Sequence, residues 1–465
     1  MKKRAFFIVL LALLILSNTA TYFYARFLYL SAPAEGVLQE HTAGGLFQEI
    51  RQILDDRYIQ PMDEEVMLYG AIRGMLGALG DVYTYYLTPE AMEEMLMQTT
   101  GLFSGIGVEI TEDEGEILVV RVLKDTPAFF AGLCQGDRIV EVDGKKTFGL
   151  TSEEAARLLR GASGTEVNIV LRRPGESELL SISLMRAQIE RESVFIRRFE
   201  AGAAYLQITH FDQGTGEAFM LALAALEREG LEGLIIDLRD NPGGLFDEAV
   251  AIGELIVPAG EITRIVDKDN NVLSQYYSRA KPQDYPMVVL VNQLTASAAE
   301  ILSGALQDSG RAFLVGTPTF GKTSVQHLQH LSDGGGLRYT IAKYLTPMGK
   351  DLHHVGLKPD FEVELPPEYY LQYYAIPRDI QLGDRGEKVY LLQTMLNFLG
   401  YPLEITGSFD ENLFDALQSF QVDQGLSPGA LDDPTREALR LTLSKKGEEI
   451  DEQLNFALNL LRDLK

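Results

Sequence analysis

The sequence predicts a multidomain protein that contains an α/β core with a largely parallel sheet. Its 465 residues suggest three or four domains, because a domain usually has about 100 to 200 residues. Between residues 188 and 365, apolar runs of strand length alternate with helical patterns, which is typical of a parallel sheet covered by helices. Residues 98–187 contain short strands and turns around one helix, and residues 45–97 read as helices.

The first 26 residues predict a membrane segment. Lys2, Lys3 and Arg4 precede the unbroken apolar run 5–16, and the segment continues to Tyr24. About 20 residues are enough to cross a bilayer, and basic residues before the run favour a cytoplasmic N-terminus with the remaining chain outside. A cleaved signal peptide is the alternative, and it also exports the chain. We therefore expect a single-pass membrane protein with an extracytoplasmic body, or a secreted protein.

Residues 27–97 are expected to form a helical region, because Leu46, Ile50 and Ile53 recur at helical spacing. The pattern then changes to alternating short apolar runs with turns between them. The strands expected in the region 98–187 are 105–110, 117–122, 137–142 and 166–172, with one helix at 153–159.

In the core, the strand-like runs and the helical patterns are well separated. The expected strands are 204–208, 233–237, 287–291 and 312–315, and the expected helices lie near 216–229, 246–255 and 298–307. In an open α/β sheet the chemistry lies at the ends of the strands. Candidate site residues are therefore expected where these apolar runs end.

The chain beyond the core divides into three parts. Pro366 and Pro367 begin a tyrosine-rich linker at 366–377, and a small module follows at 378–441. Residues 442–465 form the last part, in which 447–465 predict one amphipathic helix that packs on a neighbour.

Composition excludes several partners. The formal net charge of -26, from 67 acidic and 41 basic side chains, argues against nucleic acid and against broad attachment to an anionic membrane surface. Cys134 is the only cysteine, so an intramolecular disulfide and a thiolate metal site are excluded. We expect Cys134 to be a buried apolar filler.

Ser297 lies where the chain turns from an expected strand into an expected helix. A hydroxyl at this position lies beside unpaired backbone N–H groups and the positive end of the helix, which suits a nucleophile whose attack creates an oxyanion. The chain has no Gly-x-Ser-x-Gly motif. Lys322 can serve as the base when desolvation lowers its pKa, and Gln326 could orient the amine if the segment turns locally.

Three blocks of the sequence resemble the C-terminal processing peptidases, which are tail-specific serine proteases with a Ser-Lys dyad. The blocks are 237–244 (DLRDNPGG), 292–301 (NQLTASAAEI) and 321–326 (GKTSVQ). The resemblance covers about residues 45–365. It implies that Ser297 is the nucleophile, Lys322 the general base and Gln326 its partner.

The same resemblance implies an oxyanion hole built from backbone N–H groups. These belong to Gly243 or Gly244 and to Ala298. Glycine suits this role, since only glycine lets a backbone approach a substrate so closely. No metal and no other cofactor is implied.

Residues 98–187 resemble a PDZ domain. The carboxylate-binding loop would be Gly105, Ile106, Gly107 and Val108, and the segments that follow keep the family order. Successive N–H groups of a glycine loop can hold a C-terminal carboxylate while the peptide adds a strand to the sheet. The implied partners are proteins or peptides with exposed C-terminal tails, and the domain would recognise them or gate the site.

The module at 378–441 resembles the three-helix peptidoglycan-binding module, which implies affinity for cell-wall glycan or stem peptide. A helical dimerisation unit without a ligand is the alternative. Family resemblance also implies that residues 27–97 form a cap or dimerisation region. The homodimer would form through residues 45–97 and the C-terminal helices.

Two other motifs compete with this interpretation. Residues 316–323 match the P-loop pattern G-x-x-x-x-G-K-[ST], but a P-loop should open a long helix, and Gly334 to Gly336 interrupt the chain soon after. Ser278 and Lys281 match the Ser-x-x-Lys of penicillin-recognising enzymes, but Pro282 follows at once and the companion motifs are missing.

The histidines provide only weak metal candidates. His327 with His330, and His353 with His354, have no carboxylate at a defined spacing. We therefore expect neither a metal nor a nucleotide.

The sequence thus predicts an exported serine endopeptidase that cleaves envelope or secreted proteins near their C-terminal tails. The alternative is a catalytically silent scaffold, in which the PDZ and wall-binding modules tether partners at the envelope.

Overall fold

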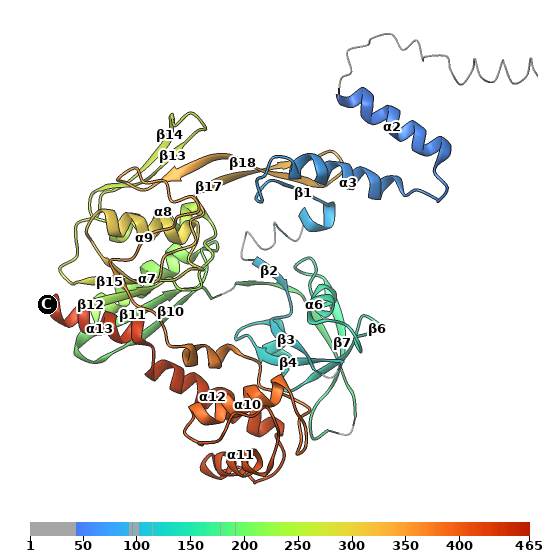
Figure 1. Ribbon diagram of the computed structural model, residues 1–465. Coiled ribbons are helices and arrows are strands. Elements are labelled where there is room, and N and C mark those ends of the chain that lie inside the picture. The colour runs from blue at the N-terminus through green and yellow to red at the C-terminus, as the bar shows by residue number, and fades with distance from the viewer. Residues whose placement is uncertain (1–42, 93–94, 96–101, 114, 177, 191) are drawn as a thin grey trace, which may run out of the picture. The chain divides into compact units, whose positions relative to one another are not determined.

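The structure is a computed structural model that describes residues 43–92, 95, 102–113, 115–176, 178–190 and 192–465 (Figure 1). The expected membrane segment at 1–26 lies outside these residues. Within them, no helix is both long and apolar enough to cross a membrane. The chain divides into two compact units, residues 1–75 and 76–465.

The described part of the first unit is helical, as predicted. It contains α2 (Ala43–Arg57) and most of α3 (Glu64–Gly77). Helix α3 begins after Asp63, whose carboxylate accepts two backbone N–H groups of the first turn. On α2, Leu46, Ile50 and Ile53 recur at helical spacing and are each about half exposed.

Residues 102–190 form the β-rich domain that the sequence predicts. Its antiparallel sheet has the order β3-β4-β5-β7-β8, with β6 beside β5. The strands are β3 (Val108–Asp113), β4 (Glu116–Val122), β5 (Arg138–Val142), β6 (Lys145–Lys146), β7 (Glu166–Arg172) and β8 (Leu180–Met185). The helices are α5 (Pro127–Phe130) and α6 (Ser152–Leu159), and β2 (Leu102–Gly105) pairs with β9 (Ala187–Glu190). Ile117, Ile139 and Ile169 are completely buried in its core.

The α/β core is built on a six-stranded sheet with the order β10-β11-β12-β15-β16-β19, in which only the β10–β11 pair is antiparallel. The strands are β10 (Val194–Arg198), β11 (Ala203–Ile208), β12 (Gly233–Asp237), β15 (Met287–Val291), β16 (Phe313–Gly316) and β19 (Phe361–Glu362). The expected parallel sheet is confirmed. Strands β12 and β15 begin and end at the predicted residues.

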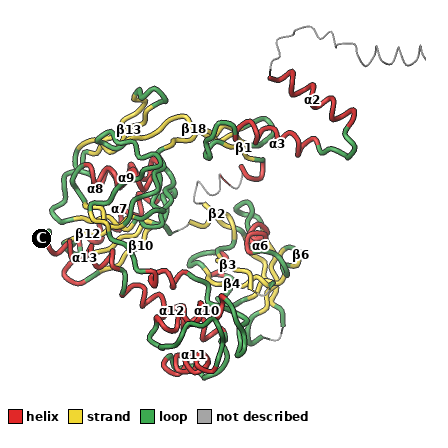
Figure 2. The backbone as a smooth tube through the Cα atoms, viewed as in Figure 1, coloured by secondary structure: helices red, strands yellow, loops and turns green. Residues whose placement is uncertain are grey.

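Both faces of this sheet are covered by helices (Figures 1 and 2). One face packs on α7 (Thr215–Arg228), α8 (Phe246–Ile256) and α9 (Ala298–Asp308), and the other on α13 (Glu452–Asp463). Leu234 and Ile236 face the first layer, whereas Ile235 faces α13. Burial on both sides explains the unbroken apolar runs of the sequence. Each fully buried Leu or Ile contributes about 1.5–3 kcal/mol.

A second, antiparallel sheet has the order β1-β18-β13-β14, with β17 paired to β18. Its strands are β1 (Tyr85–Leu87), β13 (Gly260–Val266), β14 (Val272–Ser278), β17 (Ser324–His330) and β18 (Gly336–Leu345). Strand β1 lies in the region 45–97 that the sequence pattern assigned to helices. It forms because its three residues pair with Arg338, Leu337 and Gly336 on β18, a contact that local periodicity does not report.

The C-terminal module consists of three helices, grouped together in Figure 2, as the sequence predicts. They are α10 (Glu387–Phe398), α11 (Glu411–Asp423) and α12 (Asp433–Glu449), preceded by the short helix η2 (Pro367–Tyr373). The amphipathic helix expected at 447–465 is present as α13 and packs on the core sheet, but its predicted start is wrong. Helix α12 ends at Glu449 and α13 begins after Asp451, because the Asp451 carboxylate caps the new helix through the N–H of Leu454.

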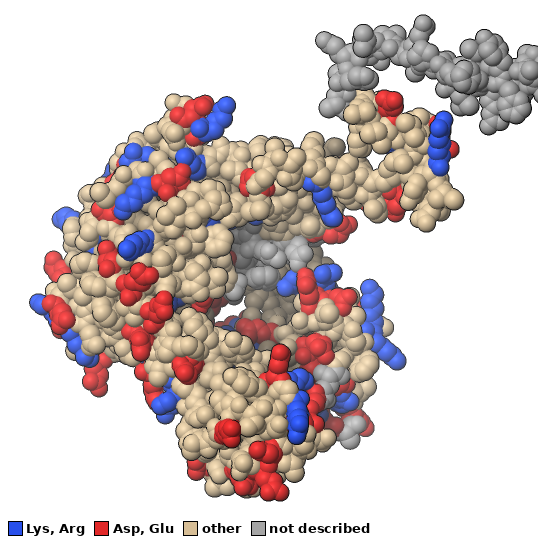
Figure 3. All heavy atoms as spheres, in the orientation of Figure 1, with Lys and Arg blue, Asp and Glu red and all other residues tan. Residues whose placement is uncertain are grey.

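Cys134 is exposed, so its expected role as a buried filler is also wrong. It lies in the turn after α5, where its backbone N–H donates to Asp137 at 2.8 Å, and the neighbouring Leu133 supplies the buried side chain. On the face drawn in Figure 3, acidic side chains are spread over the surface among basic ones, in keeping with the net charge of -26.

Candidate active site

Ser297 has a backbone conformation that serine rarely adopts. Its φ is 56° and its ψ is -117°, and such strain costs a residue other than glycine about 1–3 kcal/mol. The residue lies between β15 and the first turn of α9, and its side chain is half-buried. Its carbonyl accepts the N–H groups of Glu300 at 2.9 Å and Ile301 at 3.0 Å, which holds the turn in place. The strained strand-to-helix turn makes Ser297 the candidate nucleophile.

The completely buried carboxylate of Glu300 joins two segments. One is the turn 292–297 between β15 and α9, called the serine turn, and the other is the loop 317–323 between β16 and β17, called the lysine loop. The carboxylate accepts the backbone N–H groups of Ser297 at 2.9 Å, Gly321 at 2.7 Å and Lys322 at 2.8 Å. The hydroxyl of Thr319 donates to it as well. Four donors offset the desolvation of the buried charge.

Glu300 was not among the residues that the sequence singled out. The signal was present, because Ser297-Ala298-Ala299-Glu300 has the S-x-x-E spacing of a capping box. That pattern accounts for the bond from Glu300 to Ser297. It does not reveal the bonds to the lysine loop, which depend on the tertiary fold.

Tyr344 forms a second bridge between the same two segments. Its buried hydroxyl lies 3.0 Å from the carbonyl oxygen of Ser297 and 2.7 Å from that of Lys322. Burial, with the nearby charge of Glu300, raises the pKa of Tyr344 well above its ordinary value, so the phenol stays protonated and can donate.

Lys322 is a half-buried lysine whose pKa is lowered from its ordinary value. Burial is the main cause and the positive charge of Arg338 adds to it, whereas Glu300 acts in the opposite direction. The amine lies 4.8 Å from the centre of the Tyr83 ring. In the part of the chain that the structure describes, no hydrogen bond joins this amine to the Ser297 hydroxyl.

Gln326, the expected partner of the lysine, lies on β17 and bonds elsewhere. Its amide nitrogen donates to the carbonyl and the hydroxyl of Ser324, at 2.8 and 2.7 Å. Its oxygen accepts Arg338 Nη2 at 3.0 Å. Arg338 also donates to the Tyr85 hydroxyl on β1 at 2.9 Å. The structure therefore links Gln326 to β1 and not to Lys322.

Gly243 lies directly against the serine turn. With φ of 97°, it leaves no room for a side chain, because a Cβ there would lie 2.8 Å from Ser297 Cβ and 2.7 Å from the Ala296 carbonyl oxygen. At Gly244 a Cβ would lie 2.4 Å from the Phe211 carbonyl oxygen. Both positions require glycine.

The two glycines differ in their N–H groups. Gly243 donates to Asn241 Oδ1 at 2.8 Å. Among the described hydrogen bonds, neither the N–H of Gly244 nor that of Ala298 is donated to any acceptor. Of the two glycine alternatives that the sequence left open, Gly244 therefore has its N–H available for an oxyanion.

The loop 238–245 between β12 and α8, called the glycine loop, is hydrogen-bonded to the serine turn at two places. Thr295 Oγ1 donates to the Leu238 carbonyl at 2.7 Å. Further along, the N–H of Ala296 donates to the Asn241 carbonyl at 3.0 Å. These bonds fix the distance between the two segments.

The tertiary structure excludes the two competing interpretations, the P-loop and the Ser-x-x-Lys site. Lys322 and Thr323 lead into strand β17, whereas the lysine of a P-loop opens a helix whose N-terminus binds phosphate. Ser278 is buried on β14 and donates to the Val257 carbonyl at 2.6 Å, so it is a structural residue.

The expected PDZ loop joins β2 to β3. Ile106 is buried. Gly107 has φ of 86°, and a Cβ there would lie 2.2 Å from Thr126 Cβ, so the position requires glycine. The carbonyl groups of Ile106 and Gly107 accept the N–H groups of Ala128 and Leu123. Strand β3, which begins at Val108, is the edge strand of its sheet and contacts α6. An edge strand beside a glycine loop is the geometry that lets a peptide add a strand.

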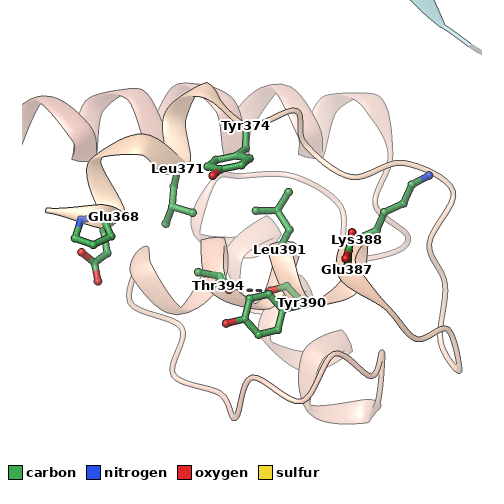
Figure 4. A pocket seen from close by; sticks show the side chains of 9 residues that line it. Glu368, Leu371, Tyr374, Glu387, Lys388, Tyr390, Leu391 and Thr394 are labelled. Atoms are coloured by element: carbon green, nitrogen blue, oxygen red, sulfur yellow. Dashed lines mark hydrogen bonds between the residues drawn. The ribbon is translucent and has the colours of Figure 1, made fainter. Parts of the chain in front are cut away.

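A cavity of about 560 Å³ lies between η2 and α10 (Figure 4). Leu391 lies between the rings of Tyr374 and Tyr390 in that view, with Glu387 and Lys388 to one side. Both tyrosines are more than half exposed. The cavity therefore has two exposed aromatic rings, an acidic side chain and a basic side chain in its lining.

A strained serine and a lysine with a lowered pKa, whose backbone N–H groups bond to one carboxylate, are residue types that serine proteases can use as nucleophile and base. Residues 202–363 match the model of peptidase family S41, and residues 118–173 match that of the PDZ domain. Residues 385–439 match a model described as a peptidoglycan-binding domain, and residues 30–91 match that of the activating protease CtpB N-terminal domain.

Two relatives from Bacillus subtilis (strain 168) are similar over most of their length. The carboxy-terminal processing protease CtpA is 35% identical over 413 residues, which are 88% of this chain and 88% of the relative. CtpB is 31% identical over 438 residues, 92% and 91% of the two chains. A solved photosystem II D1 C-terminal processing protease is 33% identical and covers 69% of this chain and 88% of its own, with a TM-score of 0.43. The chain belongs to the carboxy-terminal processing proteases of peptidase family S41.

Proposed function

We propose that the protein is an exported endopeptidase that cleaves envelope or secreted proteins near their C-terminal tails through a Ser297–Lys322 dyad. The observation that carries this proposal is the shared carboxylate of Glu300, which binds the N–H groups of both dyad residues. A nucleophile and a base anchored on one buried group are fixed relative to each other through the backbone. Preorganisation of this kind lowers the barrier of the chemical step.

The proposed reaction begins with the neutral amine of Lys322. It accepts the proton of Ser297 as the hydroxyl oxygen attacks the peptide carbonyl, and it returns the proton to the leaving amine. The oxyanion accepts the N–H groups of Gly244 and Ala298. Water then hydrolyses the acyl-enzyme. Burial supports this role of Lys322, since it lowers the pKa of the amine and so raises the neutral fraction.

The dyad must close before it can react. Lys322 lies against Tyr83, and Gln326 is bonded to Arg338, which is bonded to Tyr85. The segment with Tyr83 and Tyr85 directly precedes the PDZ region in the chain. We infer that a tail bound to the PDZ domain favours the conformation in which Lys322 turns to Ser297 and Gln326 supports it, by a shift in population.

Tail recognition is assigned to β3 and the loop of Ile106 and Gly107. The open edge of β3 supports strand addition, and among the described hydrogen bonds neither loop N–H is donated to an acceptor. These N–H groups would bind the terminal carboxylate of the substrate. The partners are thus proteins or peptides with a free C-terminus.

We further propose that the C-terminal module binds peptidoglycan, with the cavity at Tyr374 and Tyr390 as its contact site. Exposed aromatic faces suit sugar rings, and the charged groups of Glu387 and Lys388 suit the charged stem peptide. The N-terminal segment 1–26 would anchor the chain in the cell membrane with its body outside. The exposed apolar face of α2 supports a homodimer.

One experiment separates the protease from the silent scaffold. The full-length chain is incubated with an unstructured protein and with a tail peptide that occupies the PDZ domain, and cleavage is followed over time. The native chain should cleave and Ser297→Ala should not. Ser303→Ala is the matched control, because its hydroxyl lies on the same helix and donates only to the Ala299 carbonyl. A native chain that stays inactive with the tail peptide present would support the scaffold instead.

A further inference from the structure

A buried ion cluster is attached to the glycine loop. The guanidinium of Arg239, which is 7% exposed, forms a fork with Asp451, and both N–O distances are 2.9 Å. The same guanidinium donates to both oxygens of Asp237. Gln453 Oε1 accepts from it at 3.1 Å. None of these groups takes part in the reaction described above.

Asp451 reaches Arg239 from the far end of the chain. It is 4% exposed, and its carboxylate also caps α13 through the N–H of Leu454 at 2.9 Å. Helix α13 is packed against the core sheet by Leu454, Ala457 and Leu461. Asp451 is therefore held by a rigid element, and a charge-assisted bond in a buried site resists displacement.

The same place joins the C-terminal module to the core. The chain leaves the core at Val363 and returns to it at Asp451, and Gln453 donates to the Val363 carbonyl at 2.7 Å. Asp451 thus bonds Arg239 directly, and Val363 is connected to Arg239 through the side chain of Gln453. The match to peptidase family S41 ends at residue 363, so α13 lies outside the match although it covers one face of the core sheet.

Arg239 lies in the middle of the loop that faces Ser297. On either side of it, the carbonyl groups of Leu238 and Asn241 accept bonds from the serine turn. Its side chain leaves the loop on another side, toward α13. The loop is therefore held from two directions, by the serine turn and by Asp451.

We propose that Asp451 is a positioning residue of the protease. Its carboxylate fixes Arg239, and Arg239 fixes the loop that presents the N–H of Gly244 to the oxyanion. The catalytic unit then extends beyond residues 202–363 to α13, and the module is inserted within this unit. The inference rests on the proposed role of the glycine loop in binding the oxyanion.

The test measures kcat and KM of the full-length chain for a peptide with a free C-terminus, together with the folded fraction by circular dichroism. Asp451→Asn keeps the shape of the side chain and removes its charge. We expect kcat per folded molecule to fall by about 10- to 100-fold, because small misplacement of catalytic groups has effects of that size. KM should change by less than about twofold, since tail binding lies elsewhere. Glu452→Gln, at the exposed next residue, is the matched control and should leave both constants unchanged.

A double variant tests whether Asp451 acts through Arg239. Arg239→Lys loses the planar fork, and its loss of kcat should not multiply with that of Asp451→Asn, because both remove the same contact. Should Asp451→Asn fail to fold, Asp451→Glu is the second variant, because it keeps the charge and displaces the carboxylate by one methylene. It should also lower kcat without changing KM. A wild-type kcat in the folded Asp451 variant, or fully multiplicative losses, would overturn the inference. Activity in Ser297→Ala would instead overturn the proposed function.

Discussion

The backbone N–H of Ser297 donates to the buried carboxylate of Glu300 at 2.9 Å, within a turn of only four residues. The same carboxylate oxygen accepts the N–H of Lys322 at 2.8 Å. One side chain therefore supports a strained serine and, at the same time, anchors the loop of the candidate base.

Replacing Glu300 should disable the enzyme by loosening both segments. In Glu300→Gln a donor NH2 group faces N–H donors, so at least one N–H loses its partner. We expect the free energy of unfolding to fall by about 1–3 kcal/mol and kcat to fall about 100-fold. Thermal unfolding and peptide cleavage measure the two effects. Glu254→Gln on the exposed face of α8 is the control, and an equal effect there would contradict the role given to Glu300.

The pH dependence of kcat/KM should report the titration of Lys322. Only the neutral amine accepts a proton, so the rate should rise with pH and level off above the pKa of this residue, which lies below the ordinary 10.5. Arg338→Gln removes a positive charge that lowers this pKa. The rising limb of the pH profile should then move to higher pH. At a fixed pH on this limb, kcat/KM should fall about tenfold for each pH unit by which the limb moves. Arg338→Lys keeps the charge and should keep the limb in place. A limb that moves to lower pH in Arg338→Gln would refute this assignment.

Gly243→Ala should abolish activity. The new Cβ would lie 2.8 Å from Ser297 Cβ, and the residue has a positive φ that alanine tolerates poorly. Gly230→Ala separates the two causes, because Gly230 has φ of 88° but open space around its Cβ position. Both variants should lose about 1–2 kcal/mol of stability from the backbone. Only Gly243→Ala should lose more than about 100-fold in kcat, as measured by peptide cleavage.

Tail binding should depend on the loop at Gly107. A Cβ at this position would lie 2.2 Å from Thr126 Cβ, so Gly107→Ala should distort the loop. Fluorescence polarisation with a labelled peptide should show at least tenfold weaker binding, about 1.4 kcal/mol. A peptide amidated at its C-terminus should lose a similar amount with the native chain. Gly132→Ala is the control, since nothing lies within 4 Å of its Cβ position. Equal binding of the free and amidated peptides would contradict carboxylate recognition.

Retention on cell-wall material should depend on the cavity between η2 and α10. Tyr390→Ala removes one of its two exposed rings. We expect the affinity for purified peptidoglycan, measured by sedimentation, to fall about tenfold, which is about 1.4 kcal/mol. Peptide cleavage in solution should be unchanged. Tyr277→Ala removes a similarly exposed ring on β14, and sedimentation equal to that of Tyr390→Ala would exclude the cavity as the binding site.

Local sequence determined the elements of the core and the position of the candidate nucleophile. Strands 233–237 and 287–291 form as predicted, because burial on both faces requires unbroken apolar runs with polar residues at their ends. The turn at Ser297 could likewise be predicted, since a strand pattern changes there into a helical pattern.

Only the tertiary structure decided the contacts between distant segments. Strand β1 exists because β18 pairs with it, and the helix break at Asp451 is fixed by a cap and by an ion pair with Arg239, 212 residues earlier. Local patterns carry no information on such pairs, because each partner has an ordinary local sequence and gains its stability only where the chain closes. Resemblance to a known family indicated that Ser297 and Lys322 belong together, whereas the buried carboxylate that joins their segments became visible only in the folded chain.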